Sequence, residues 1–262
     1  MSENEIRIPG LRIVEVPRAQ VQPDRPGERH ILQVATLDGL MAGRYDGDVT
    51  IGELLAHGDH GIGTLNSLDG ELLVLDGEVF QMTADGVSHP VPPERLTPFA
   101  MVTFMRPDAD EIFEGTHDRS EIEAEIGRLA DSPEASLCIR LDGHFPRVDA
   151  RSAVPERKQY RLFAEALAAN QRKFKFEQAT GSFFGYRFPD EARGIEIPGY
   201  HLHFVTEDRT RGGHMLDYQA TDVRIRVMRA TVLQVELPPG AEAERPGISE
   251  KDLGAVQELE GR

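Results

Sequence analysis

Residues 199–217 read GYHLHFVTEDRTRGGHMLD, and three of the nine histidines of the chain lie in this one stretch. Two strand-like runs flank a charged segment that ends in a glycine pair, which is typical of a β-hairpin. Side chains two residues apart on a strand point to the same face, so His201 and His203 share a face. A return strand can bring His214 opposite them. The stretch therefore predicts an antiparallel hairpin with three imidazoles on one side.

Three imidazoles on one face have the composition of a metal site. A lone strand histidine is more often a surface or core residue, and an H-x-H pair alone is weak evidence. The third histidine at hairpin return distance, after Gly212 and Gly213, favours metal binding. Three neutral imidazoles about 2 Å from one ion, with the remaining positions open, form the ligand set of a catalytic zinc or a similar divalent cation. The candidate ligands are His201, His203 and His214.

The rest of the chain is rich in strand signals. Asp76-Gly77 joins two alternating runs, which predicts a hairpin with a type I′ turn. Capping boxes predict helices that begin near Thr50 with Glu53 and near Ser120 with Glu123. Residues 159–170 and 248–262 read as helices, and residues 1–30 as an arm that is ordered only by lying on another part of the protein. Beyond residue 140 most segments read as antiparallel strands of a small sandwich or barrel.

Composition excludes several classes of function. The 262 residues carry a net charge of −16, which argues against binding to nucleic acid because phosphate contacts need a basic face. No apolar run is long enough to span a membrane. Cys138, the only cysteine, lies in an apolar strand-like segment and reads as buried rather than reactive. The acidic start MSENEIRIPG lacks the features of a signal peptide, so the expected location is cytoplasmic.

A second reading of the hairpin stays open. The spacing H-x-H-x-x-x-E, with Glu207 as the acid, resembles the first metal motif of the cupin barrels. A cupin site needs another histidine well downstream, and no histidine follows His214. The alternative function is a cupin-like, non-catalytic barrel that binds a structural or sensory ion.

Longer motifs bring in a different family. The segments QVATLDGLMAGRYDGD (33–48), GDHGIGTLNSLDGELLVLDGEVFQ (58–81), LTPFAMVTF (96–104) and GYHLHFVTEDRTRGGHMLDY (199–218) together closely resemble α-acetolactate decarboxylase. The likeness runs from about residue 30 to about residue 260, and the combination of the two long motifs is specific. The resemblance implies a two-domain α/β fold. Residues 1–140 would form an N-terminal mixed sheet with helices that pairs across a homodimer, and residues 141–262 a C-terminal antiparallel barrel that carries the metal.

The resemblance also implies a set of site residues. His201, His203 and His214 correspond to the zinc ligands of the family. The motif glutamate corresponds to Glu71, the site threonine to Thr64 and the site arginine to Arg151, with Arg147 as the second choice. A glutamate near the C-terminus corresponds to Glu260, with Glu258 as the other candidate. From their neighbourhood alone, His57 and His60 are expected to be structural, and Asp217 is expected to orient a ligand imidazole.

The implied reaction is the zinc-dependent decarboxylation of 2-acetolactate to (R)-acetoin, on a route to acetoin and butanediol. Loss of CO2 from this 2-hydroxy-3-keto acid leaves an electron pair that the adjacent ketone can accept as an enediolate. A divalent cation can stabilise the enediolate as a Lewis acid, so no organic cofactor is required. Arg151 would hold the substrate carboxylate, and Glu71 or Glu260 would protonate one face of the enediolate. The expected partner is therefore a small-molecule substrate.

Overall fold

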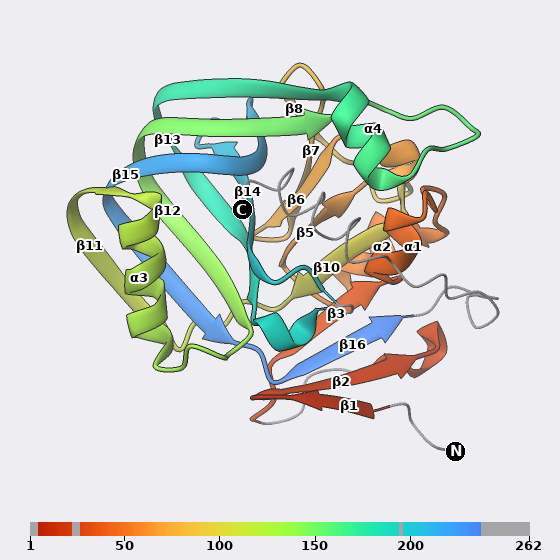
Figure 1. The fold of residues 1–262 in the computed structure, drawn as a ribbon, viewed down its shortest axis with the longest axis horizontal. Coiled ribbons are helices and arrows are strands. Elements are labelled where there is room, and N and C mark those ends of the chain that lie inside the picture. Colours follow the sequence, from red (N-terminus) through yellow and green to blue (C-terminus); the bar gives the residue numbers. More distant parts are fainter. Residues whose placement is uncertain (1–4, 23–26, 194–195, 237–262) are drawn as a thin grey trace.

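The computed structural model describes residues 5–22, 27–193 and 196–236, and within them the protein is mostly β with few helices. Figure 1 shows two sheets: one at the left, with β11, β12 and β15, and one that runs from β1 at the lower right to β8 near the top. The α-helices among these residues are few and short, and the longest has twelve residues. The expected α/β class therefore overestimated the helix content. No helix of this part of the chain is long and apolar enough to cross a membrane.

The first sheet is mixed, as predicted, and has nine strands. Its β16 runs parallel to both of its neighbours, whereas the other pairings are antiparallel. In spatial order the strands are β1 (Glu5–Ile8), β2 (Leu11–Val16), β16 (Val232–Glu236), β3 (His30–Val34), β10 (Phe99–Thr103), β5 (His60–Thr64), β6 (Glu71–Leu75), β7 (Glu78–Met82) and β8 (Ser88–Pro90).

The second sheet is antiparallel and nearly closed. Strand β15 pairs with β12, β12 with β13, and β13 with β14. Strand β14 also pairs with β15, so these four strands form a ring. The strands in order are β11 (Ala109–Asp118), β15 (Gly212–Arg229), β12 (Leu137–Ala153), β13 (Gln171–Phe188) and β14 (Gly199–Thr206). A barrel-like sheet that carries the histidine hairpin is thus confirmed.

Short elements complete the fold. Strands β4 (Val49–Thr50) and β9 (Leu96–Thr97) pair with each other. The α-helices are α1 (Leu37–Met41), α2 (Ile51–Leu55), α3 (Arg119–Ala130) and α4 (Phe163–Asn170), and one-turn 3-10 helices span Arg18–Gln20, Asn66–Leu68 and Asp190–Ala192.

The sheets do not divide the chain at residue 140. That residue lies inside β12, and β11, which precedes it, belongs to the second sheet. Strand β16, from the far end of the chain, lies in the first sheet between β2 and β3 (Figure 1). The predicted arm does lie on another part of the protein, since β2 pairs with β16, but its hairpin of residues 5–16 was not predicted. The division into two domains at residue 140 remains a prediction.

Local signals explain most element boundaries. Asp76 and Gly77 have φ angles of 54° and 79°, as the predicted type I′ turn requires. Thr50 and Glu53 form the predicted capping box of α2. The prediction for α3 was wrong by two residues, since Asp118 and Glu121 make its capping box and Ser120 bonds to Asp118 instead. The predicted helix at 159–170 begins only at Phe163, and the one at 248–262 lies outside the described residues.

Alternation along β6 orients the residue at its start. Leu72 and Val74 pack into a cluster with α2, whereas Leu73 and Leu75 pack into the cluster between the two sheets. Glu71 has the parity of Leu73, so its side chain faces the second sheet. Phe184 and Tyr186 of β13 enter the same inter-sheet cluster from the other side. Residues that point into this interface from either sheet are thus brought together by apolar burial.

Candidate metal centre at the sheet interface

Strands β14 and β15 bring the three histidines together. His203 is the direct cross-strand partner of His214, and His201 precedes His203 by two residues on the same face. The ring nitrogens that could bind a metal all lie within 4.8 Å of one another, and the ring centroids are 4.9–5.3 Å apart. His203 and His214 are each 1% exposed, and His201 is partly exposed. The cluster is accessible from the side of His201.

Gly212 and Gly213 are needed for strand packing rather than for the turn. The turn is formed by residues 206–211. The Thr206 N–H donates to the Arg211 carbonyl, and Asp208 Oδ1 accepts from the Thr206 hydroxyl and the Thr210 N–H. A Cβ on Gly212 would lie 2.3 Å from the Phe204 carbonyl oxygen, and one on Gly213 would lie 2.7 Å from that of Arg151. Both glycines therefore let β15 approach its neighbours closely beside His214.

The first sheet fixes the tautomer of His203. Its Nδ1 lies 2.8 Å from the Leu72 carbonyl oxygen on β6. A carbonyl only accepts, so Nδ1 carries the proton and Nε2 presents its lone pair to the cluster. Nε2 is buried and has no hydrogen-bond partner among the described residues. Burial lowers the pKa of His203 to about 3, with a further contribution from the charge of Arg151. A neutral imidazole with an oriented, unpartnered lone pair is the state that binds a metal.

Glu71 and Arg151 meet beside this cluster. The Arg151 Nη1 donates to Glu71 Oε1 at 2.7 Å, and Glu71 Oε2 lies 3.5 Å from His203 Nε2. Arg151 on β12 is the cross-strand partner of His214 on β15, so β6 and β12 both deliver a charged group to the same place. Arg151 is 1% exposed and Glu71 7% exposed. The sequence expectation that both residues converge on the histidines agrees with these positions.

The donor set fits a divalent cation. Three imidazole nitrogens lie within one small cluster, and a carboxylate stands next to it. This ligand type suits zinc and related first-row metals. The fit rests on the orphaned Nε2 of His203 and the convergence of the rings.

The remaining predicted residues have varied surroundings. The Thr64 hydroxyl donates to the Gly70 carbonyl at 2.7 Å, so it braces the turn before Glu71. Arg147, the second choice for the site arginine, pairs with Asp149 and Asp217 instead. Asp217 was expected to orient a ligand imidazole; for His203 the Leu72 carbonyl has that role, and for His201 and His214 the expectation stays a prediction. Glu258 and Glu260 lie outside the described residues.

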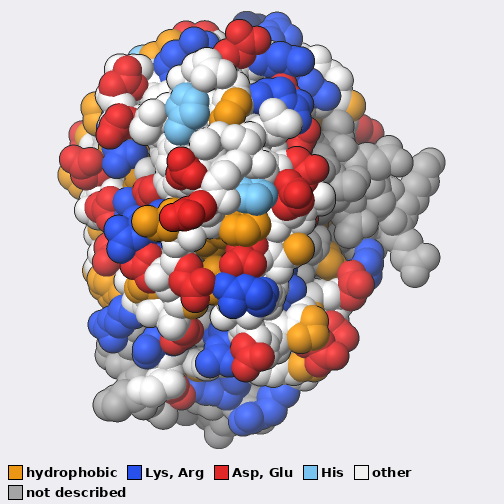
Figure 2. Space-filling model, turned by 90° about the vertical axis from the view of Figure 1, so that its left-hand side faces the viewer, with side chains coloured by type: hydrophobic (Ala, Val, Ile, Leu, Met, Phe, Trp, Pro, Cys, Tyr) orange, Lys and Arg blue, Asp and Glu red, His pale blue; other side chains and the backbone are white. Residues whose placement is uncertain are grey.

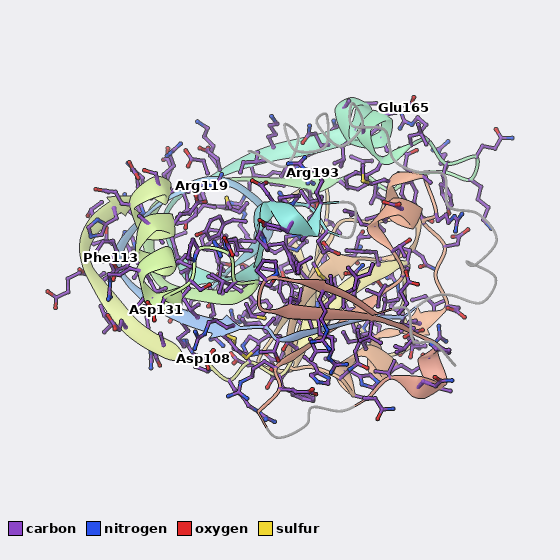
Figure 3. The ribbon with its side chains drawn as sticks, turned by 60° about the horizontal axis from the view of Figure 1, so that its bottom comes forward. Asp108, Phe113, Arg119, Asp131, Glu165 and Arg193 are labelled. Carbon is purple, nitrogen blue, oxygen red and sulfur yellow. The ribbon has the colours of Figure 1, made fainter. Side chains whose placement is uncertain are left out.

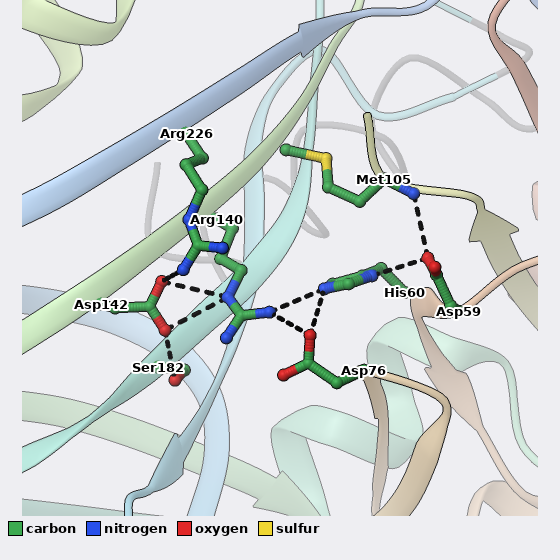
Figure 4. Close-up of polar contacts among 8 residues, drawn as sticks. All are labelled: Asp59, His60, Asp76, Met105, Arg140, Asp142, Ser182 and Arg226. Carbon is green, nitrogen blue, oxygen red and sulfur yellow. Dashed lines mark hydrogen bonds and ion pairs between the residues drawn. The ribbon is translucent and has the colours of Figure 1, made fainter. Parts of the chain in front are cut away.

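His60 and Arg140 are buried and belong to a separate polar network, drawn in Figure 4, whose aspartates Asp59 and Asp76 reach the surface. Its Nδ1 bonds to Asp59 at 2.7 Å and its Nε2 to Arg140 Nη1 at 2.9 Å. Arg140 also reaches Asp76 at 2.5 Å and Asp142 at 3.0 Å. This network joins the ends of β5 and β6 to β12, which agrees with the expected structural role of His60. His57 precedes it in a loop and is partly exposed.

Sequence reasoning missed the Leu72 carbonyl as the partner of His203. Every residue has a carbonyl, so no side-chain pattern could have indicated it. The unusual backbone of the segment between Thr64 and Glu71 was also missed, because Ser67 and Leu68 are ordinary residues in the sequence although both have positive φ angles.

Fold and site together define a mostly β protein with a three-histidine candidate metal centre between two sheets. A sequence model of the alpha-acetolactate decarboxylase family matches residues 31–245. The chain belongs to the alpha-acetolactate decarboxylase family, a family of carboxy-lyase enzymes. Membership in this family argues against the cupin alternative, and Glu207, the acid of that motif, is exposed and lies outside the metal-ligand cluster of the described residues.

Similar proteins cover most of the chain. The alpha-acetolactate decarboxylase of Methanosarcina mazei is 38% identical over 87% of this chain and 80% of its own length. That of Bacillus licheniformis is 35% identical over 92% of this chain and 95% of its own. The crystal structure of alpha-acetolactate decarboxylase from Bacillus subtilis strain 168 superposes with a TM-score of 0.84 at 34% identity, covering 89% of this chain and all of that one.

Proposed function

We propose that this protein decarboxylates 2-acetolactate to (R)-acetoin with zinc bound by His201, His203 and His214. The observation that carries the proposal is the convergence of Glu71 and Arg151 on the histidine cluster. Glu71 lies 3.5 Å from His203 Nε2, and Arg151, the cross-strand partner of His214, donates to Glu71 at 2.7 Å. Family membership supports the same reaction. Together they provide a cation site, an anion-binding group and a carboxyl group in one buried place.

Arg151 is proposed to bind the substrate carboxylate. A guanidinium has five N–H donors in one plane, so it can hold Glu71 and a second carboxylate together. Its burial strengthens these contacts because little water screens them. The bound metal would act as a Lewis acid toward the hydroxyl and ketone oxygens of the substrate. The carboxylate would then leave as CO2, and its bonding electron pair would pass into the neighbouring carbonyl system to give an enediolate.

A carboxyl group completes the reaction by protonating carbon. Glu71 and Glu260 are the two candidates, and delivery of the proton to one face of the enediolate sets the handedness of acetoin. Thr64 supports Glu71 through its bond to the Gly70 carbonyl, next to Glu71 in the chain. His203 stays neutral because its burial lowers its pKa, and it is correctly oriented because the Leu72 carbonyl accepts its Nδ1 proton.

The assembly is proposed to be a homodimer in the cytoplasm, with the two domains divided near residue 140. Among the described residues, strands β1 and β8 are the edges of the first sheet, and an edge strand can pair with a second copy. The acidic net charge of −16 keeps such a protein apart from nucleic acid. Figure 2 shows acidic and basic side chains interspersed over the described part of one face.

Acetoin formation from racemic 2-acetolactate tests the proposal. Native protein, chelator-treated protein and treated protein given zinc are compared, together with His203→Ala and the control His144→Ala. His144 lies on the second sheet and bonds to Gln178. We expect chelator-sensitive, zinc-restored production of one acetoin enantiomer, abolished in His203→Ala and retained in His144→Ala. Acetoin no faster than in a protein-free blank would refute the proposal.

A further inference from the structure

The turn between Thr64 and Glu71 has a strained backbone. Ser67 has φ 68° and ψ 20°, and Leu68 has φ 55°. The left-handed region is unfavourable for a non-glycine residue because its Cβ crowds the backbone, and two such residues in succession are rare. Such a conformation persists only where the surroundings enforce it.

Three contacts enforce the conformation at Ser67. Its N–H donates to the Tyr45 carbonyl at 2.7 Å, and its carbonyl accepts from the Glu156 N–H at 2.7 Å. The Tyr160 hydroxyl donates to Asp46 Oδ1 at 2.9 Å, so the Ser67 hydroxyl donates to the Tyr160 oxygen at 3.0 Å. Both backbone groups and the side chain of Ser67 are thus fixed by other segments.

The neighbours of Ser67 are fixed as well. Leu68 is 3% exposed and packs into the cluster between the sheets. Gln81 donates to the Asp69 carbonyl at 2.8 Å, and Thr64 donates to the Gly70 carbonyl at 2.7 Å. The turn is therefore held from both sides up to the residue before Glu71.

Two ties join the same two segments of the chain. Ser67 lies four residues before Glu71, and Glu156 lies five residues after Arg151. The Glu156 N–H to Ser67 carbonyl bond and the Glu71–Arg151 ion pair thus connect the same two segments. If the turn relaxed, the segment that carries Glu71 could move relative to the segment that carries Arg151.

We infer that Ser67 and Tyr160 are positioning residues, which hold the strained turn so that Glu71 meets Arg151 at the metal centre. Neither residue is required to touch substrate, and each acts through Glu71. The inference rests on the proposed function for its catalytic consequence. Its structural part, that the turn is held by Tyr160, stands independently of the reaction.

The test compares Ser67→Gly and Tyr160→Phe with wild type in the zinc-loaded enzyme. Glycine accepts the left-handed backbone without strain but removes the hydroxyl, and phenylalanine removes only the Tyr160 hydroxyl. The control is Asp131→Gly, which relieves another left-handed residue, with φ 50°, at the exposed end of α3 (Figure 3). We expect kcat to fall about tenfold in both variants with KM within about twofold, since small displacements of a catalytic group reduce rates steeply. Asp131→Gly should leave kcat unchanged.

Hydrogen exchange of peptides that cover residues 65–73, measured without metal, gives the second readout. Faster exchange in Ser67→Gly and Tyr160→Phe, but not in Asp131→Gly, supports the brace even if wild type shows no decarboxylase activity and the proposed function fails. Unchanged exchange overturns the inference. If wild type is active, a kcat of Ser67→Gly within twofold of the wild-type value also overturns the inference. A fall in kcat that occurs only together with a lowered melting temperature overturns it as well.

Discussion

His203 and Leu72 belong to different sheets, and the 2.8 Å bond from His203 Nδ1 to the Leu72 carbonyl oxygen links the candidate metal centre to the first sheet. The second sheet supplies the three imidazoles, and the first sheet sets the tautomer of one of them. Glu71, the residue before Leu72, makes the parallel link to Arg151. The centre is thus a property of the interface between the sheets.

The buried ion pair gives the first prediction. Arg151→Met leaves the Glu71 carboxylate buried without its partner, and we expect the metal-free protein to lose about 3–5 kcal/mol of unfolding free energy. Adding Glu71→Gln should recover part of that loss, since the uncompensated charge is then removed. Urea unfolding measures both. Arg224→Met, at the exposed pair with Asp110, is the control and should cost less than about 1 kcal/mol. Equal losses in the single and double variants would contradict the coupling.

The pKa of His203 predicts acid sensitivity of the metal-free protein. The folded value is about 3 and the ordinary value is 6.5, so the unfolded chain binds the extra proton first as pH falls. The contribution is fully present above pH 6.5 and is lost progressively down to about pH 3. One such group gives a slope of about 1.4 kcal/mol per pH unit in the unfolding free energy. His203→Gln removes this titrating group, so between about pH 3 and 6.5 the slope of the unfolding free energy against pH should decrease by about 1.4 kcal/mol per pH unit. Burial also lowers the pKa of His60, so His60→Gln should flatten it in the same direction.

The network around Arg140 predicts a stability effect away from the metal centre. Arg140 is 8% exposed and pairs with Asp76 and Asp142, so Arg140→Met leaves two carboxylates without this partner. We expect a loss of about 1–3 kcal/mol in urea unfolding, because Asp76 is exposed and Asp142 keeps its pairing with Arg226. Arg128→Met, on an exposed arginine of α3, should change stability by less than about 1 kcal/mol. A loss as small as that of Arg128→Met would show that the network is not held together by Arg140.

The C-terminal glutamates give a prediction about product handedness. If Glu260 delivers the proton, Glu260→Gln should lower kcat at least a hundredfold or yield racemic acetoin, as expected for loss of a general acid. Glu258→Gln is the matched control, two residues away in the same tail, and should keep both rate and handedness. Chiral gas chromatography of the product measures the outcome. A reversed pattern would assign the role to Glu258, and two unaffected variants would leave Glu71 as the donor.

Local sequence patterns predicted the local structure well. The Asp76-Gly77 turn, the capping box of α2 and the histidine hairpin follow from neighbours within a few residues, where backbone preferences and side-chain spacing act directly. Longer relations were predicted less well. The place of β16 in the first sheet and the hairpin of residues 5–16 depend on pairing between the two ends of the chain, which no local pattern records.

The sequence by itself determined the ligand types and their face. An H-x-H pair on a strand and a third histidine on its return strand fix three imidazoles on one side, because side chains alternate along a strand. Resemblance to the family added Glu71, Arg151 and Thr64 as candidates. Only the tertiary structure decided that Glu71 reaches Arg151, that Leu72 orients His203, and that Ser67 is strained. These relations join residues that are 80 and 131 positions apart in the chain or depend on contacts between such segments. They arise when the two sheets bury their apolar faces against each other. The sequence causes this burial, but the resulting contacts cannot be read from local patterns of residues.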